Sequence, residues 1–174
     1  MGYQIRRYKF DDVPQDGDIF VSGWASSRGW WRSRGQRHLV RRVARALDAT
    51  RREGAAQDDR RLQKVGVHLD VEWHARALHP WDGDLGPERQ AQLFASRLLD
   101  DTATAIRRLF DALPEVDSIR ILVREPAPAH ETLLEGTVSR AAVGECAGCR
   151  SPAMMLKLLG VCFRLNDGRL EPLA

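Results

Sequence analysis

Hydrophobic and polar residues alternate strictly along residues 65–79, VGVHLDVEWHARALH. The apolar positions are Val67, Leu69, Val71, Trp73 and Ala75, and the polar positions are His68, Asp70, Glu72, His74 and Arg76. Such alternation predicts a half-buried β-strand, because successive side chains of a strand point to opposite faces. One face is expected to pack on a core, and the other carries residue types that bind metals or transfer protons.

Three other segments repeat apolar residues at the helical period. Residues 33–54 begin with a capping-box pattern and end at a glycine, which predicts a first helix. Residues 87–113 carry one wide apolar stripe, begin with a proline and are followed by another, which predicts a long helix. A short third helix is predicted over residues 153–159, after a Ser-Pro pair and before a glycine.

Short runs rich in β-branched and aromatic residues predict the remaining strands. They cover residues 3–10, 18–26, 118–125, 132–140 and 161–173, the last being a small hairpin around Asn-Asp-Gly. Turn residues between the first two runs, and a loop between the next two, predict two antiparallel hairpins. Residues 55–64, AAQDDRRLQK, are interpreted as a polar connector.

From residue 65 onward, the predicted order is strand, long helix, strand, strand, short helix, strand. This is the β-α-β-β-α-β order of a ferredoxin-like α+β two-layer sandwich, with an antiparallel sheet and both helices on one face. We therefore predict one compact domain in two parts. Residues 1–64 form an N-terminal hairpin and Arg-rich helix extension, and residues 65–174 form the ferredoxin-like core. The extension either continues the sheet or packs across its open face.

The composition is that of a soluble globular protein. The 174 residues are 43% hydrophobic and 29% charged, and no apolar run reaches the roughly 20 residues that span a bilayer. The first ten residues lack the apolar core of a signal peptide, so we expect a cytoplasmic protein without a membrane partner. Arginine greatly outnumbers lysine, a bias that a GC-rich, bacterial-like genome would produce.

Positive charge is concentrated in the first third of the chain. Residues 1–66 contain 15 Lys or Arg and 8 acidic residues, whereas residues 67–174 contain 12 and 16. The predicted first helix places its arginines opposite its apolar residues, without the intermixed acids of an ordinary solvated helix. Just before it, tryptophans alternate with arginines, a pairing that grips single-stranded nucleic acid.

These features predict a non-enzymatic nucleic-acid-binding or nucleoprotein-assembly protein, with DNA or RNA as its partner. The predicted contact residues are Arg28, Trp30, Trp31, Arg32, Arg34, Arg37, Arg41, Arg42 and Arg45. The cationic helix face could also bind an acidic protein partner or the protein's own acidic half, or it could simply be solvated. An adaptor between proteins is therefore a further alternative.

The polar face of the residue 65–79 strand is a second candidate site. Same-face neighbours lie about 6.6 Å apart, so the outer histidines of this face are too distant to bind one ion together. Asp70, Glu72 and His74 could serve a metal-dependent phosphodiesterase or nuclease, with the carboxylates holding Mg²⁺ and the histidine acting as base. The favoured interpretation is an ion ladder with Arg120 and Arg124. A surface covered by the N-terminal segment or a partner is the third.

The three cysteines, Cys146, Cys149 and Cys162, do not form the disulfide framework of a secreted domain. A zinc site would need the distant His130 as its fourth ligand, and the C-x-x-C pair could alternatively be redox-active. Ordinary reduced thiols are the favoured interpretation. The sequence identifies no cofactor and leaves open whether the protein is an enzyme.

Overall fold

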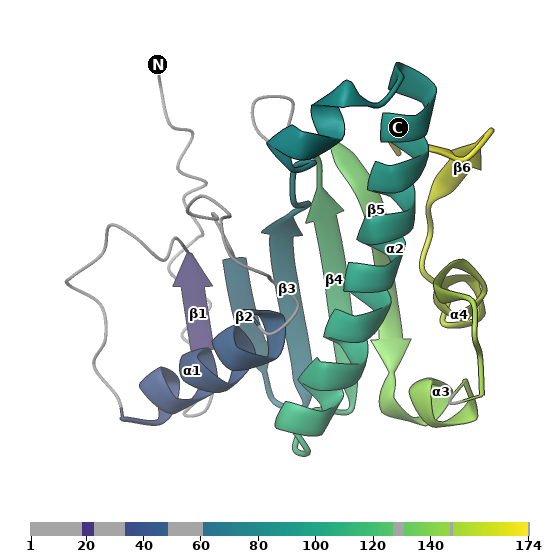
Figure 1. Ribbon diagram of the computed structural model, residues 1–174. Coiled ribbons are helices and arrows are strands. Elements are labelled where there is room, and N and C mark those ends of the chain that lie inside the picture. Colours follow the sequence, from purple (N-terminus) through teal and green to yellow (C-terminus); the bar gives the residue numbers. More distant parts are fainter. Residues whose placement is uncertain (1–18, 23–33, 49–60, 127–130, 147, 174) are drawn as a thin grey trace.

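The computed structural model describes residues 19–22, 34–48, 61–126, 131–146 and 148–173. They form a mixed α+β structure with helices on one face of a five-stranded sheet (Figure 1). The sheet strands are β1 (Ile19–Ser22), β2 (Arg61–Val65), β3 (His68–His74), β4 (Ser118–Arg124) and β5 (Thr132–Ser139). A separate hairpin consists of β6 (Arg164–Asn166) and β7 (Arg169–Glu171). The helices are α1 (Arg34–Asp48), the 3₁₀ helix η1 (Pro80–Asp84), α2 (Pro87–Ala112), α3 (Arg140–Glu145) and α4 (Pro152–Leu158).

The sheet runs in the order β1-β2-β3-β4-β5, with β3 and β4 parallel and the other neighbours antiparallel. Helix α2 makes the long crossover that parallel neighbours require. The mixed α+β class is thus confirmed, but the strand order differs from the predicted ferredoxin-like one, in which the last strand lies beside the first strand of the unit. Here β2 occupies the place beside β3, and β6 pairs with β7 outside the sheet.

A tight turn explains why β2 takes that place. Gly66 and Val67 join β2 to β3, and Gly66 has a φ of +56°, which glycine adopts at little cost. Two-residue turns with glycine first favour hairpins, so β2 pairs locally with β3. The interpretation of residues 55–64 as a connector is therefore wrong at its end, because β2 begins at Arg61. Because residues 55–64 are rich in charge, they did not resemble a strand, although the Leu62 side chain of β2 is buried in the core.

Strand β1 extends the sheet by pairing with β2. Residues 3–10, which were predicted to be its hairpin partner, lie outside the described residues. Since β1 and β2 share one sheet with β3, the sheet continues across the part boundary predicted between residues 64 and 65.

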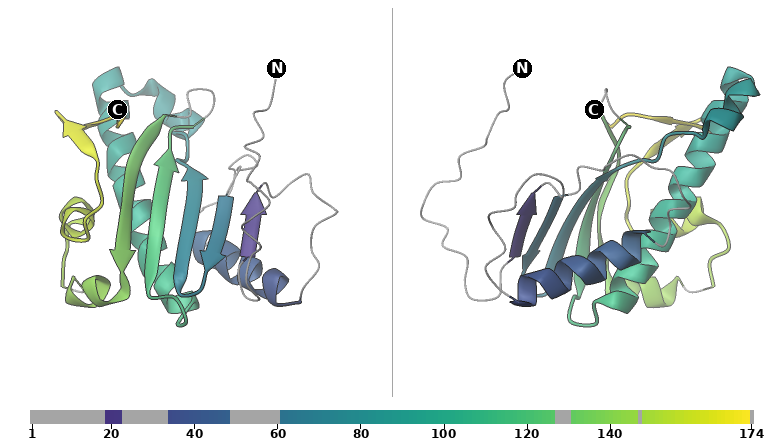
Figure 2. Two further views of the ribbon diagram at one scale, coloured as in Figure 1. Left: turned by 180° about the vertical axis from the view of Figure 1, so that it is seen from behind. Right: turned by 60° about the vertical axis from the view of Figure 1, so that its left-hand side comes forward.

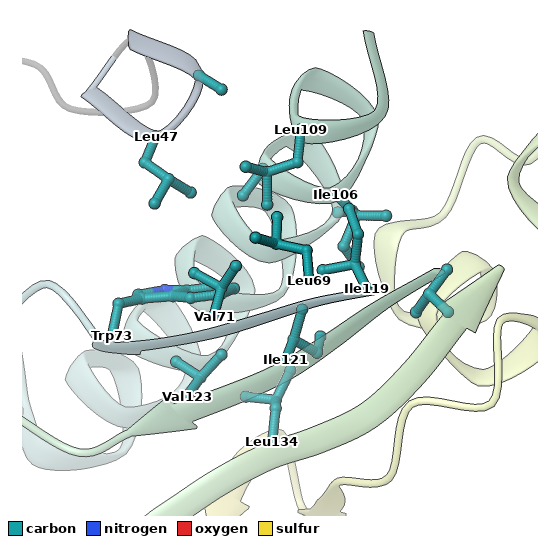
Figure 3. Packing of buried hydrophobic residues seen from close by; sticks show 14 of the residues in the cluster. Leu47, Leu69, Val71, Trp73, Ile106, Leu109, Ile119, Ile121, Val123 and Leu134 are labelled. Carbon is teal, nitrogen blue, oxygen red and sulfur yellow. The ribbon is translucent and has the colours of Figure 1, made fainter. Parts of the chain in front are cut away.

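The predicted alternation of the central strand is confirmed for its core face. Leu69, Val71 and Trp73 of β3 are buried, and β4 contributes a parallel row of inward side chains from the next strand. Figure 3 shows both rows meeting Ile106 and Leu109 of α2. Val67 is an exception, 45% exposed, because it lies in the β2–β3 turn.

Helix α2 matches the long helix that the apolar stripe predicted, and it places its buried face on the sheet. Pro87 stands in its first turn, where the missing backbone N–H costs nothing. Within the described ranges, no helix is both long and apolar enough to cross a membrane. One polar group interrupts the buried face of α2: the Thr102 side chain is completely buried, and its hydroxyl has no hydrogen-bond partner among the described residues.

Thr102→Val is expected to raise the free energy of unfolding by about 1 kcal/mol, because it removes a buried hydroxyl without a partner and leaves a side chain of similar shape. Urea denaturation measures the change. Thr102→Ser is the matched control, since it keeps the hydroxyl and loses the methyl group, and it should destabilise. A less stable valine variant would contradict the burial of an unsatisfied hydroxyl.

The C-terminal part of the chain contains one helix that was predicted and one that was not. Helix α4 agrees with the prediction and is capped by Ser151, whose hydroxyl accepts a hydrogen bond from the Met154 N–H at 3.4 Å. The β6–β7 hairpin is also confirmed, with Asp167 and Gly168 both at positive φ, as a type I′ turn requires. Helix α3 is additional, and it directly follows β5.

Candidate nucleic-acid interface and polar sheet face

Helix α1 separates apolar from cationic side chains. It lies beside α2 on the same face of the sheet (Figures 1 and 2). Its buried residues are the apolar ones that the predicted helix placed opposite its arginines, namely Leu39, Val40, Val43, Ala46 and Leu47. Its exposed side includes His38, Arg41 and Arg45. The spacing of three and four residues aligns these three side chains along one side of the helix.

Arg42 lies at the edge between the two sides of α1 and contacts the end of α2. Its Nε donates a hydrogen bond to the Ala112 carbonyl at 2.7 Å, and its Nη1 and Nη2 bind the two carboxylate oxygens of Glu115 at 2.9 and 3.0 Å. This bidentate geometry is the one in which Arg binds a carboxylate most strongly. One predicted nucleic-acid contact is therefore already engaged by the protein's own acidic half.

The carboxyl group of Glu115 responds to that contact. Partial burial raises its pKa, but the hydrogen bond from Arg42, its own backbone N–H and the charges of Arg42 and Lys64 more than offset burial, so the pKa lies below its usual value. Glu115 is thus ionised under ordinary conditions, and the Arg42–Glu115 pair fixes α1 against the C-terminus of α2.

Arg41 and Arg45 differ from Arg42. Both side chains are exposed, and neither forms an ion pair or hydrogen bond with another described residue. They lie one helical turn apart, at a spacing that brings their Cβ atoms to about 5–6 Å. Two like charges therefore lie side by side on a helix whose opposite face is buried.

The other predicted contact residues fall outside what the structure describes. Arg28, Trp30, Trp31 and Arg32 precede α1 and lie outside the described residues. Arg34 and Arg37 belong to the first turns of α1, but only their backbone is described. Their role therefore stays a prediction.

The polar residues of β3 alternate with its buried ones, so they lie on the side of the sheet away from the helices; the left view of Figure 2 looks onto that side of the sheet. Glu72 makes the predicted kind of cross-strand contact there, because its carboxylate accepts a hydrogen bond from Arg124 Nε at 2.5 Å. On the same face, the register partner of Asp70 on β4 is Arg120. The ion ladder is thus confirmed at its Glu72–Arg124 rung.

The structure does not assemble a metal centre from the trio Asp70, Glu72 and His74. Glu72 is engaged by Arg124, and among the described residues no three His, Cys, Asp or Glu side chains are grouped as metal ligands. The geometry thus gives no support to the metal-dependent hydrolase alternative. At the start of the strand, the ring of His68 contacts the hydroxyl of Ser118 across to β4.

The cysteines occupy two places. Cys146 and Cys149 are half-buried in the turn between α3 and α4, whereas Cys162 is exposed and pairs by its backbone with Glu135 at the edge of β5. His130, the fourth ligand that a zinc site would need, lies outside the described residues.

Comparison with protein-family models, with curated proteins and with solved structures finds no significant match to this chain.

One exposed aromatic residue was not singled out from the sequence. Trp81 is 83% exposed on η1 and stacks on the ring of His79, with the two planes 6° apart. Asp82 anchors this turn through a 2.5 Å ion pair with Arg97, and the hydrogen bond from Arg97 holds the pKa of Asp82 below its usual value. The segment HPWDGD is rich in turn residues, and nothing local in it shows that the indole ring faces solvent.

Proposed function

We propose that this protein binds nucleic acid through the exposed cationic side of α1, as a binding or assembly protein rather than an enzyme. The observation that carries the proposal is the pair Arg41 and Arg45, exposed one turn apart without partners among the described residues. Arginines at helical spacing bind phosphate oxygens and carry no sequence information by themselves. The expected interaction is therefore with the backbone, with little sequence preference.

The contrast with α2 supports a functional role for this charge. The exposed side of α2 mixes signs, with Arg89, Asp100, Arg107 and Asp111 at the surface, as a solvated helix usually does. On α1, Arg41 and Arg45 repel each other, which costs stability unless an anionic partner relieves the repulsion. Phosphate backbones are such a partner, and they release counterions when they bind.

Acidic residues of the protein's own C-terminal part bind only some of the arginines of α1. Glu115 binds Arg42 at the side of α1 and leaves the Arg41 and Arg45 side chains in solvent. An acidic protein partner would use the same two arginines, and the salt dependence and the choice of probe separate it from nucleic acid.

Replacing both Arg41 and Arg45 by alanine is expected to weaken nucleic-acid binding about tenfold or more near 0.1 M salt, and to lower the slope of log affinity against log salt by about 2. Fluorescence anisotropy with labelled single- and double-stranded DNA and RNA measures both quantities. The full chain is used, so that the Arg- and Trp-rich segment before α1 is present.

The matched control is Arg89→Ala with Arg107→Ala, which removes the same charge from the exposed side of α2. These two substitutions should change affinity only slightly. Equal losses in both double variants would mean that net charge alone drives binding. Absent or salt-insensitive binding by the unmodified protein would overturn the proposal.

A further inference from the structure

Cys146 and Cys149 of the C-x-x-C motif lie between two helices and are joined by a backbone hydrogen bond. Cys146 is the C-cap of α3, and its carbonyl accepts a hydrogen bond from the Cys149 N–H at 3.0 Å. A turn closed in this way brings its first and last Cα atoms to within about 7 Å. Disulfides bridge Cα atoms about 4.4–6.8 Å apart, so the backbone already holds the two cysteines near bonding range.

The surroundings single out this pair from the third cysteine. Cys146 and Cys149 are half-buried and pack against the edge of the hydrophobic core, which restricts the positions of both side chains. Cys162 is exposed on a different segment, where backbone hydrogen bonds with Glu135 hold it beside β5. It therefore serves as an internal reference thiol.

We propose that Cys146 and Cys149 form a reversible disulfide by exchange with a low-molecular-weight disulfide such as oxidised glutathione. One cysteine loses its proton to solvent, and its thiolate attacks glutathione disulfide, which forms a mixed disulfide and releases one glutathione thiolate. The second cysteine, also deprotonated, attacks the protein sulfur of the mixed disulfide and releases the second glutathione. Two protein thiols are oxidised, glutathione disulfide is reduced to two thiols, and the released thiolates take up the two protons.

The bond would strengthen the junction between α3 and α4. Helix α3 has six residues, too few to be stable alone. Its N-terminal end is held by Ser139, whose hydroxyl accepts a hydrogen bond from the Ala142 N–H at 3.2 Å. In the reduced protein, the turn hydrogen bond between Cys146 and Cys149 constrains the other end. A disulfide makes that constraint covalent, so oxidation should order α3.

The test incubates the folded full chain in glutathione buffers of increasing oxidised fraction, followed by acid quenching, alkylation of free thiols and intact-mass measurement. The expected product before alkylation is about 2 Da lighter, because two thiol hydrogens are lost, and it takes up a single alkyl group. Peptide mapping should place that group on Cys162. Amide hydrogen exchange across residues 140–149 should slow several-fold on oxidation.

Three variants make the outcome specific. Cys162→Ser should retain the disulfide, whereas Cys146→Ser and Cys149→Ser should abolish it and give at most a mixed disulfide with glutathione. A disulfide that includes Cys162, three alkylatable thiols at every buffer ratio, or equal oxidation of the folded and the urea-unfolded chain would overturn the proposal. The nucleic-acid assays do not bear on this result.

Discussion

Gly136→Ala is expected to destabilise the protein by about 3 kcal/mol, because β5 and the segment after α4 meet at this residue without room for a side chain. A Cβ atom at position 136 would lie 2.9 Å from the Cα of Val161 and 3.0 Å from the carbonyl oxygen of Gly160. Both contacts are with backbone, so no side chain can rotate away. Relief requires the chain at residues 160–162 to move off β5.

That movement would break a defined set of hydrogen bonds. The Cys162 N–H donates to the Glu135 carbonyl at 2.7 Å, and the Glu135 N–H donates to the Cys162 carbonyl at 3.1 Å. These two bonds are the isolated bridge that joins the outer edge of β5 to the C-terminal segment. Equilibrium urea unfolding measures the loss, and faster hydrogen exchange of the Cys162 amide in the variant would report the local separation.

Gly144→Ala provides the matched control within the same part of the fold. A Cβ atom at Gly144 would have no heavy atom within 4 Å, and the residue belongs to α3. Alanine is favoured over glycine in helices by up to about 1 kcal/mol, so this variant should be unchanged or slightly more stable. If Gly136→Ala unfolds at the same urea concentration as the parent, the backbone at residues 160–161 does not approach Gly136 as closely as the structure shows.

The elements that sequence periodicity predicted well are those in which local pattern and burial agree. Helix α2 carries its apolar stripe through 26 residues, and β3 alternates through its full length. Strand β2 was missed because Leu62 is its one described buried side chain, so its five residues offer no apolar period to detect. Helix α3 was missed because RAAVGE continues a strand pattern and has little apolar periodicity.

The strand order could not be read from element order alone. A β-α-β-β-α-β sequence of elements is compatible with several sheets, and pairing depends on turns and on contacts far apart along the chain. Gly66, at positive φ, lies in the tight turn that pairs β2 with β3, and this pairing determines which strand lies beside β3. The β6–β7 turn, with Asp167 and Gly168, likewise commits the last two strands to each other rather than to the sheet.

In the candidate site too, the features set by the local sequence pattern could be predicted, and the contacts between residues far apart in the chain could not. Strand alternation correctly placed Glu72 and Arg124 on one face, where their ion pair joins diagonal neighbours, because the register partner of Arg124 is His74. The helical period correctly placed Arg41 and Arg45 opposite the buried residues of α1. It could not show that Arg42 reaches Glu115, because that partner is 73 residues away and is brought close only by the packing of α1 on α2.

Arg140→Ala is expected to cost about 3 kcal/mol of stability, because one guanidinium serves several carbonyls at the end of α2. Its Nη1 donates to the carbonyl of Phe110 at 3.1 Å, its Nη2 to those of Leu113 and Val116 at 2.7 Å each, and its Nε to Val116 at 3.1 Å. The group also stacks 4.9 Å from the centre of the Phe110 ring. Carbonyls in the last turn of a helix have no partner within it, and a cation there also favours the helix dipole.

Two further variants separate charge and geometry in the Arg140 effect. Arg140→Lys keeps the cation but not the planar fork of donors, so it should recover only part of the loss, leaving about 1–2 kcal/mol. Arg150→Ala removes an exposed arginine that has no hydrogen bond or ion pair with another described residue, and it should be close to neutral. Urea unfolding of all three variants ranks them by their free energy of unfolding. A lysine variant as stable as the parent would show that charge alone suffices, whereas an alanine variant as stable as Arg150→Ala would show that the carbonyls at the end of α2 are satisfied by solvent.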